Sequence, residues 1–163
     1  MTEDAMCGMC DGATRGAELA KMMDLVDRYG WAIQFVEGEK ARAKWAYTVG
    51  LARHGLPELV VTGLRPERAG LLLNDTAHGV LCHDERWEPG QRFRTADRLR
   101  IEIVGLPHPE AHLGTVVALF PERPLQALQL VWCDGRGRWP WNPRFNGGIG
   151  GQPVLGPRSR RAT

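Results

Sequence analysis

The sequence lacks the motifs of several common enzyme classes. Its 163 residues include a single serine, Ser159, close to the C-terminus, and no GxSxG nucleophile elbow. No Walker loop is present, and no GxGxxG fingerprint follows a predicted strand. The glycine-rich stretch of residues 147–151 precedes no predicted helix, so it does not resemble a phosphate cradle. These absences argue against serine hydrolase chemistry and give no support to a nucleotide-phosphate loop.

The sequence also lacks signals for secretion or for membrane insertion. No apolar run approaches the roughly 20 residues that span a bilayer, and the N-terminus has neither a basic nor an apolar leader region. Four cysteines in such a chain do not predict a disulfide framework. We therefore expect a soluble cytoplasmic protein with no membrane partner. The sequence gives no indication of its oligomeric state.

Neither sign of charge is in large excess. The chain has 21 basic and 19 acidic residues, a net charge of +2. This balance implies no polyanionic partner, so we do not expect binding to nucleic acid. The closing arginines at positions 158, 160 and 161 are more typical of a solvated tail.

Hydrophobic periodicity predicts one α+β domain with a mainly antiparallel sheet of about six strands, three helices and a loop-rich C-terminal segment. The predicted helices cover residues 15–29, 66–82 and 109 to about 121, and the predicted strands cover residues 31–36, 45–51, 58–62, 91–95, 99–106 and 127–133. Short connections between the first three strands predict an antiparallel meander. We expect this domain to span residues 14–156, between a flexible N-terminus (1–13) and a basic disordered tail (157–163).

The strongest strand signal lies between Trp45 and Leu64. Residues 45, 47, 49 and 51 are large and fall on one face, whereas Ala46, Thr48 and Gly50 fall on the other. Small side chains allow a helix, another backbone or a ligand to come close. The small face is therefore a candidate binding surface.

Several sequence blocks, in order along the chain, resemble a known bacterial family. These are the N-terminal CGMCDGATR, then WAYTVGL, GLPELVVTGL, LLLND, ALQLVWCDGRGRWPW and the closing GQPVLG. Together they are similar to the bacterial domain of unknown function 4262. The resemblance implies a single compact domain and carries over no activity or catalytic residue.

Two groups of cysteines and histidines could hold a metal ion. Cys7 and Cys10 have the Cys-x-x-Cys spacing that suits zinc or thiol redox chemistry. His78, Cys82 and His83 lie at the end of a predicted helix, where positions 78 and 82 share one face. If the N-terminus folds back onto this helix, a Cys₃His or Cys₂His₂ zinc site becomes possible. The alternatives are a thiol-bearing N-terminus and histidines that favour the helix dipole.

The C-terminal loop has arginines interleaved with tryptophans. Arg138, Trp139 and Trp141 suit a planar or anionic ligand through bidentate hydrogen bonds and cation–π contacts. We predict a pocket between this loop and the small face at Thr48, in which Arg138 holds the anionic part of the ligand and the indoles hold the flat part. The alternative is that the tryptophans anchor the loop to the core.

Two other functions stay open from the sequence. Tyr47, Thr48, His54 and Glu58 lie near the ends of the predicted hairpin and could perform acid–base chemistry, although Tyr47 belongs to the core face. The chain could also be a metal- or cofactor-dependent enzyme that uses the cysteines and histidines. A third alternative is an immunity or regulatory protein-interaction module that uses Trp87 and residues 135–163. The leading prediction is a protein that binds a small planar or anionic ligand.

Overall fold

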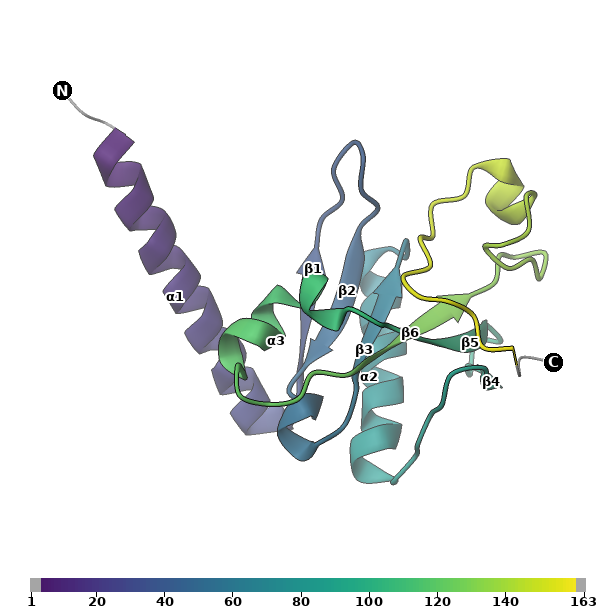
Figure 1. The fold of residues 1–163 in the computed structure, drawn as a ribbon, viewed down its shortest axis with the longest axis horizontal. Coiled ribbons are helices and arrows are strands. Elements are labelled where there is room, and N and C mark those ends of the chain that lie inside the picture. The colour runs from purple at the N-terminus through teal and green to yellow at the C-terminus, as the bar shows by residue number, and fades with distance from the viewer. Residues whose placement is uncertain (1–3, 161–163) are drawn as a thin grey trace.

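The fold is a single six-stranded mixed sheet with helices on both faces (Figure 1). The computed structural model describes residues 4–160, and their side chains from residue 14 onward. The helices are α1 (Asp4–Tyr29), α2 (Pro66–Cys82) and α3 (Gly114–Leu119), with short 3₁₀ helices η1 (Leu51–His54), η2 (Pro109–Ala111) and η3 (Phe145–Gly148). The strands are β1 (Ala32–Val36), β2 (Trp45–Val49), β3 (Glu58–Thr62), β4 (Arg92–Arg94), β5 (Arg100–Gly105) and β6 (Ala127–Trp132). The predicted α+β class and the predicted order of elements are confirmed.

The strand order is β1-β2-β3-β6-β5-β4, and all neighbours are antiparallel except β3 and β6. The first three strands form the predicted meander. β6 then enters between the two antiparallel parts of the sheet and pairs in parallel with β3. Its residues 127–131 are buried, as predicted for a central strand covered on both faces.

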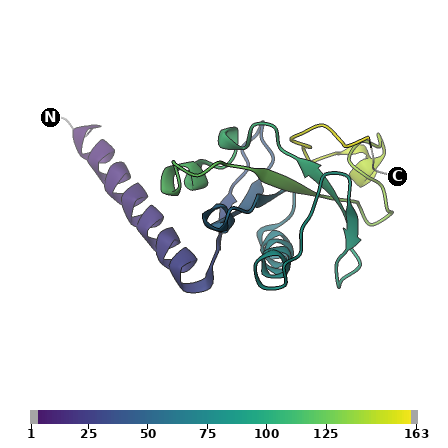
Figure 2. The same ribbon diagram turned by 60° about the horizontal axis from the view of Figure 1, so that its bottom comes forward.

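One face of the sheet is covered by α2 (Figure 2). Pro66 occupies the start of this helix, where its fixed φ suits helical geometry and its missing N–H is not needed. Leu73 and Ala77 of the helix are fully buried in a cluster with Leu59 and Leu130 of the sheet. Each large side chain buried in this way contributes roughly 1.5–3 kcal/mol. The small face of β2 is thus next to α2, because Ala46 belongs to the same cluster.

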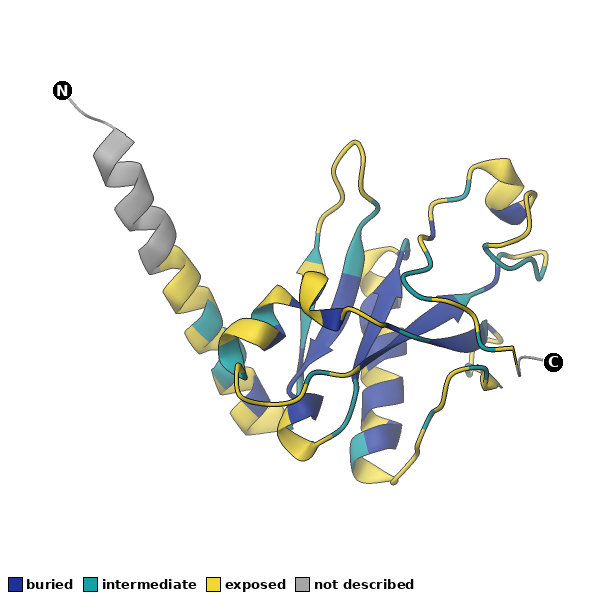
Figure 3. Cartoon of the chain, in the orientation of Figure 1, coloured by how far each residue is buried: buried dark blue, intermediate teal, exposed yellow. Residues whose placement is uncertain are grey.

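The opposite face is covered by α3, by the C-terminal half of α1, and by the returning C-terminal segment (Figures 2 and 3). Val26 of α1 and Val116 of α3 pack there against Tyr47 and Val49 of β2. The two large residues of β2 therefore belong to the core, as the alternation predicts.

Two helices differ from the prediction. α1 begins at Asp4 rather than near residue 15. The predicted third helix is divided into η2 and α3, because His112 and Leu113 between them have non-helical backbone angles. Leu113 is fully buried, and the break in the helix allows it to reach the core while α3 continues along the surface.

The segment 152–158, here called the C-terminal strap, is bound to the sheet by two glutamines. The Gln152 side chain accepts a hydrogen bond from the backbone N–H of Trp132 (2.9 Å) and donates one to its carbonyl (2.7 Å). Gln129 of β6 donates to the carbonyl of Pro153 (2.8 Å) and accepts from the backbone N–H of Leu155 (2.7 Å). Side-chain amides thus replace strand pairing here. In the part of the chain that the structure describes, no helix is long and apolar enough to cross a membrane.

Candidate functional site

Thr48 and Glu58 form a closed hydrogen-bond network inside the turn after β2. The Thr48 hydroxyl donates to Glu58 Oε2 (2.6 Å) and accepts from the backbone N–H of Leu59 (2.8 Å). Glu58 Oε1 accepts from the backbone N–H groups of Gly50 (2.9 Å) and Ala52 (3.0 Å). Burial raises the pKa of Glu58 above its usual value, although these hydrogen bonds partly oppose the shift. The network fixes the geometry of the turn.

This arrangement separates the four residues predicted for acid–base chemistry. Thr48 and Glu58 are fully buried, whereas His54 is exposed at the end of η1. Tyr47 points to the opposite face of β2 and accepts a hydrogen bond from the backbone N–H of Thr115 (3.1 Å). Only Thr48 and Glu58 are in contact, and their polar atoms are directed at the protein itself.

The two tryptophans of the C-terminal loop stack on each other and on arginines. Their ring centroids are 5.4 Å apart with an interplanar angle of 10°. The Arg158 guanidinium lies 3.6 Å from the centroid of Trp141, and those of Arg92 and Arg100 lie 5.0 and 5.4 Å from that of Trp139. We call these five residues the tryptophan–arginine cluster. Guanidinium groups occupy positions where a planar ligand would stack.

A buried carboxylate, Glu102 of β5, holds two of these arginines. Arg92 donates to Glu102 Oε2 from Nε (3.1 Å) and Nη2 (2.9 Å). Arg158 donates to Oε1 from Nε (3.2 Å) and to Oε2 from Nη2 (3.3 Å). The side chain of Glu102 is 0% exposed. Because the neighbouring residues Ile101 and Ile103 face α2, Glu102 lies on the other face of the sheet.

The structure does not bring Thr48 together with the tryptophan loop. Strands β3 and β6 separate β2 from β5, and the cluster lies on the sheet face opposite α2. Arg138 donates from Nη1 to the carbonyl of Arg144 (2.9 Å), within its own loop. Of the four residues predicted to bind a ligand, only Trp139 and Trp141 therefore lie in contact with each other.

The cluster belongs to a strongly basic end of the molecule. Residues 92–100 and 134–160 together contain two aspartates and nine arginines, namely Arg92, Arg94, Arg98, Arg100, Arg136, Arg138, Arg144, Arg158 and Arg160. We call this region the arginine-rich end. It includes a hollow of about 510 Å³ lined by Arg68, Asp97, Arg98, Leu99, Arg100, Trp132, Cys133, Asp134, Gly135, Gly137 and Asn146. The hollow lies where β6 ends and α2 begins.

The charges of this hollow are only partly balanced. Asp97 forms an ion pair with Arg68 (3.3 Å). Desolvation acts to raise the pKa of Asp134, but hydrogen bonds from the backbone N–H groups of Arg138, Asn146 and Arg136 hold it below its usual value. Its charge is therefore directed at its own loop. Among the described residues, Arg98 and Arg100 have no carboxylate partner.

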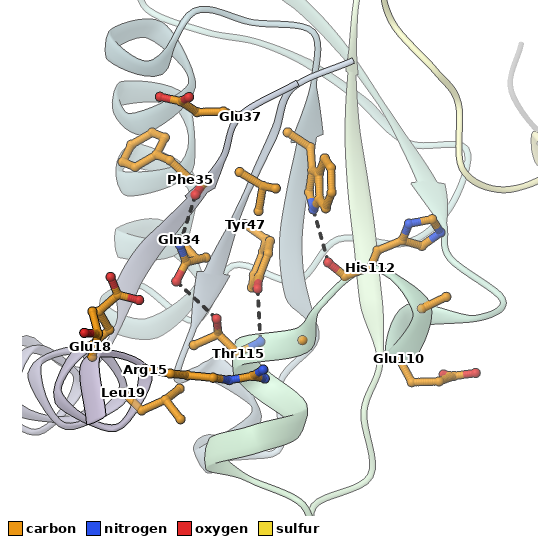
Figure 4. A pocket seen from close by; sticks show the side chains of 15 residues that line it. Arg15, Glu18, Leu19, Gln34, Phe35, Glu37, Tyr47, Glu110, His112 and Thr115 are labelled. Atoms are coloured by element: carbon orange, nitrogen blue, oxygen red, sulfur yellow. Dashed lines mark hydrogen bonds between the residues drawn. The ribbon is translucent and has the colours of Figure 1, made fainter. Parts of the chain in front are cut away.

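A larger hollow, of about 720 Å³, lies between α1, the β1–β2 pair and the η2–α3 turn (Figure 4). The Thr115 hydroxyl donates to Gln34 Oε1 (3.1 Å) across it, and Trp45 Nε1 donates to the carbonyl of His112 (3.1 Å). These bonds, with the one from the Thr115 N–H to Tyr47, join the η2–α3 turn to the sheet. The hollow has mixed charged and aromatic walls.

The family profile described as Domain of unknown function (DUF4262) matches residues 25–146, well over half of the chain. The chain belongs to this family. The predicted resemblance is thus confirmed, although the matched region is shorter than the sequence blocks suggested. No curated protein and no solved structure matches the chain.

The DUF4262 region contains all six strands and the lining of the arginine-rich hollow, but it excludes the strap and Arg158. It also excludes the Cys-x-x-Cys segment. The side chains of Cys7 and Cys10 lie outside those that the structure describes. His78 and His83 come together, with ring centroids 5.0 Å apart, and Cys82 is exposed.

No group of three or more His, Cys, Asp or Glu residues is arranged as a metal site among the described residues. Zinc bound by Cys7, Cys10, His78, Cys82 or His83 therefore stays a prediction. Elemental analysis of the DUF4262 protein, purified without a histidine tag, tests it directly.

Sequence reasoning missed the arginines that complete the cluster. Arg92 and Arg100 lie on strands about 40 residues before the tryptophans. The alternation of side chains along a strand predicts which face of the sheet each arginine occupies, but not which residue it contacts. It also missed the hollow of Figure 4. The available signal was Tyr47, which carries a hydroxyl on a face that otherwise consists of apolar core residues.

Proposed function

We propose that this protein binds a small anionic ligand at its arginine-rich end. The observation that supports this most is the pair Arg98 and Arg100, which line one hollow with no carboxylate partner among the described residues. Arginine presents a planar fork of donors that matches carboxylate and phosphate groups. An anion in this hollow would supply the charge that the chain itself does not.

The size and position of the hollow support the same proposal. Its volume of about 510 Å³ falls within the roughly 300–1,000 Å³ of small-molecule sites. It adjoins the end of β6 (Trp132) and the first turn of α2 (Arg68), close to the carboxyl ends of the one parallel strand pair among the described residues. Open sheets often bind ligands at such a position. Leu99 and Trp132 provide apolar surface beside the charged groups.

The tryptophans have a different role in this proposal from the one that the sequence suggested. Trp139 contacts the Arg100 guanidinium (5.4 Å from the ring centroid) and so restricts its position before a ligand arrives. A planar ligand that stacked on Trp141 would have to displace Arg158. The anionic part of the predicted ligand therefore has more support than the planar part.

Calorimetric titration at low ionic strength tests the proposal, since added salt screens exposed charges. The probes are pyrophosphate, citrate and adenosine monophosphate, which present phosphate or carboxylate groups of different shape. We expect at least one of them to bind, and we expect Arg98→Ala and Arg100→Ala each to weaken that binding about tenfold or more, since a hydrogen bond to a charged group contributes about 1.5–3 kcal/mol.

Arg136→Ala is the matched control. Arg136 lies in the same basic region and its side chain is exposed; among the described residues, its backbone N–H is bonded and its guanidinium is not. The control should bind the anion as the wild type does. The proposal is wrong if none of the probes binds the wild type, or if the double variant Arg98→Ala/Arg100→Ala binds as tightly as the control.

A further inference from the structure

We propose a second ligand site, independent of the arginine-rich end, in the hollow of Figure 4. The geometry favours a small molecule that carries both an ammonium and a carboxylate group, such as a basic amino acid. Four separate parts of the chain build the walls: α1, β1, β2 and the η2–α3 turn. With a volume of about 720 Å³, the hollow is larger than the one at the arginine-rich end.

The charged groups of this hollow are one arginine and three glutamates. Arg15 and Glu18 come from α1, Glu37 follows β1, and Glu110 belongs to η2. Among the described side chains, no ion pair joins Arg15 to any of these carboxylates. Glu110 lies 3.7 Å from Nδ1 of His108, so the lining offers one positive group and two carboxylates without an ion pair among the described residues, those of Glu18 and Glu37, to a ligand. This excess favours a ligand with a net positive charge that also has an anionic group.

Figure 4 shows how these groups are arranged. Arg15 extends from α1 toward Thr115, on the side of the hollow where the Tyr47 hydroxyl lies. Glu18 lies on the α1 side, and Glu110 lies on the far side beyond the η2–α3 turn. A carboxylate placed near Arg15 would leave the rest of a ligand close to Glu18, one turn further along α1.

Tyr47 provides a hydroxyl donor at the same place. Its side chain is almost fully buried (2% exposed), and its one described hydrogen bond is as acceptor from the backbone N–H of Thr115. The hydroxyl proton has no described acceptor. Tyrosine hydroxyls that are buried usually donate to a partner. A ligand carboxylate beside Arg15 would accept this hydrogen bond.

An aromatic ring lines the wall of the hollow at β2. It is that of Trp45, which is held by its hydrogen bond to the His112 carbonyl. The Phe35 ring lies on the other face of the sheet, beside Gly70 of α2. Aromatic faces attract ammonium groups and also bury the methylene stem that connects the two charged ends of a ligand.

Three probes separate the contributions of the ammonium and carboxylate groups of the ligand. L-Lysine has two amino groups and a carboxylate, cadaverine is lysine without the carboxylate, and glutarate has carboxylates alone. By calorimetric titration of the full chain, we expect L-lysine to bind about tenfold more tightly than cadaverine and glutarate not to bind. Arg15→Ala should reduce the affinity for L-lysine to that for cadaverine, and Tyr47→Phe should weaken L-lysine binding alone.

Arg28→Ala is the control, because Arg28 lies on the same helix, is exposed and, within the described part of the chain, forms an ion pair with Asp24 alone (3.0 Å). It should leave all affinities unchanged. The inference is wrong if L-lysine does not bind, if glutarate binds as well as L-lysine, or if Arg15→Ala preserves the preference for L-lysine over cadaverine. Pyrophosphate binding at the arginine-rich end should be the same in Arg15→Ala as in the wild type. The two proposed sites can therefore be refuted independently of each other.

Discussion

Replacing Arg92 by alanine tests how the buried carboxylate of Glu102 is held. Arg92 donates two hydrogen bonds to one oxygen of this carboxylate, at 2.9 and 3.1 Å, and Glu102 is 0% exposed. Because the arginine side chain is itself 32% exposed, water weakens the interaction below that of a fully buried pair. We expect Arg92→Ala to lower the free energy of unfolding by about 2 kcal/mol.

Arg158 makes longer bonds to the same carboxylate, at 3.2 and 3.3 Å, so Arg158→Ala should lower the free energy of unfolding by about 1–2 kcal/mol, including the lost contact with Trp141. The double variant leaves a buried carboxylate without either cation. Its free energy of unfolding should fall by about 3–5 kcal/mol, and a double-mutant cycle measures the coupling energy between the two arginines.

Urea denaturation of the four proteins in the cycle gives these free energies, and thermal scans give a second readout. In a domain of this size, 2 kcal/mol corresponds to a fall in melting temperature of roughly 4–8 °C. Arg94→Ala is the control, because Arg94 lies two residues along the same strand, is exposed and forms no ion pair among the described residues. This prediction is refuted if the free energy of unfolding of Arg92→Ala lies within about 0.5 kcal/mol of that of the Arg94→Ala control.

Two further predictions concern buried parts of the fold. Burial raises the pKa of Glu58 in the folded state, so the folded protein binds the carboxyl proton of Glu58 more tightly than the unfolded chain does. The free energy of unfolding should therefore fall as pH rises from about 4.3, the usual glutamate pKa, through the raised pKa. Glu58→Gln should remove that part of the slope in urea unfolding measured between pH 4 and 8, and parallel curves for the two proteins would contradict it. Gly156→Ala would place a Cβ in severe overlap with the carbonyl oxygen of Gly105, so the strap must move and the free energy of unfolding should fall by about 1–3 kcal/mol. Gly135→Ala, whose added Cβ meets no atom within 4 Å, is the control in the same denaturation assay.

Local pattern was sufficient to predict most elements of the fold. The alternation of large and small residues placed β2 correctly and identified Tyr47 and Val49 as core, and α2 occupies its predicted residues. The parallel pairing of β3 with β6 was not predicted, because strands about 70 residues apart carry no local signal of register. The division of the third helix also escaped prediction, since it depends on the position at which Leu113 enters the core.

The candidate site was predictable only in its residue types. The sequence indicated that guanidinium and indole groups act together, and the structure shows Trp139 and Trp141 in such contacts. Their arginine partners come from β4, β5 and the strap rather than from the loop that contains Arg138. The small face at Thr48 receives α2 instead of the tryptophan loop, because β2 and β5 lie on different sides of the central strands.

Net charge concealed the separation of charge along the chain. Residues 1–91 contain ten basic and 14 acidic residues, whereas residues 92–163 contain 11 basic and five acidic residues, so a total of +2 averages two unlike halves. Charges at physiological ionic strength are screened beyond about 8 Å, and an approaching ligand responds to the groups beside it rather than to the total. The arginine-rich hollow and the glutamate-lined hollow should therefore select ligands of opposite net charge on one small domain, and a substitution of charge in one hollow should leave the affinity of the other unchanged.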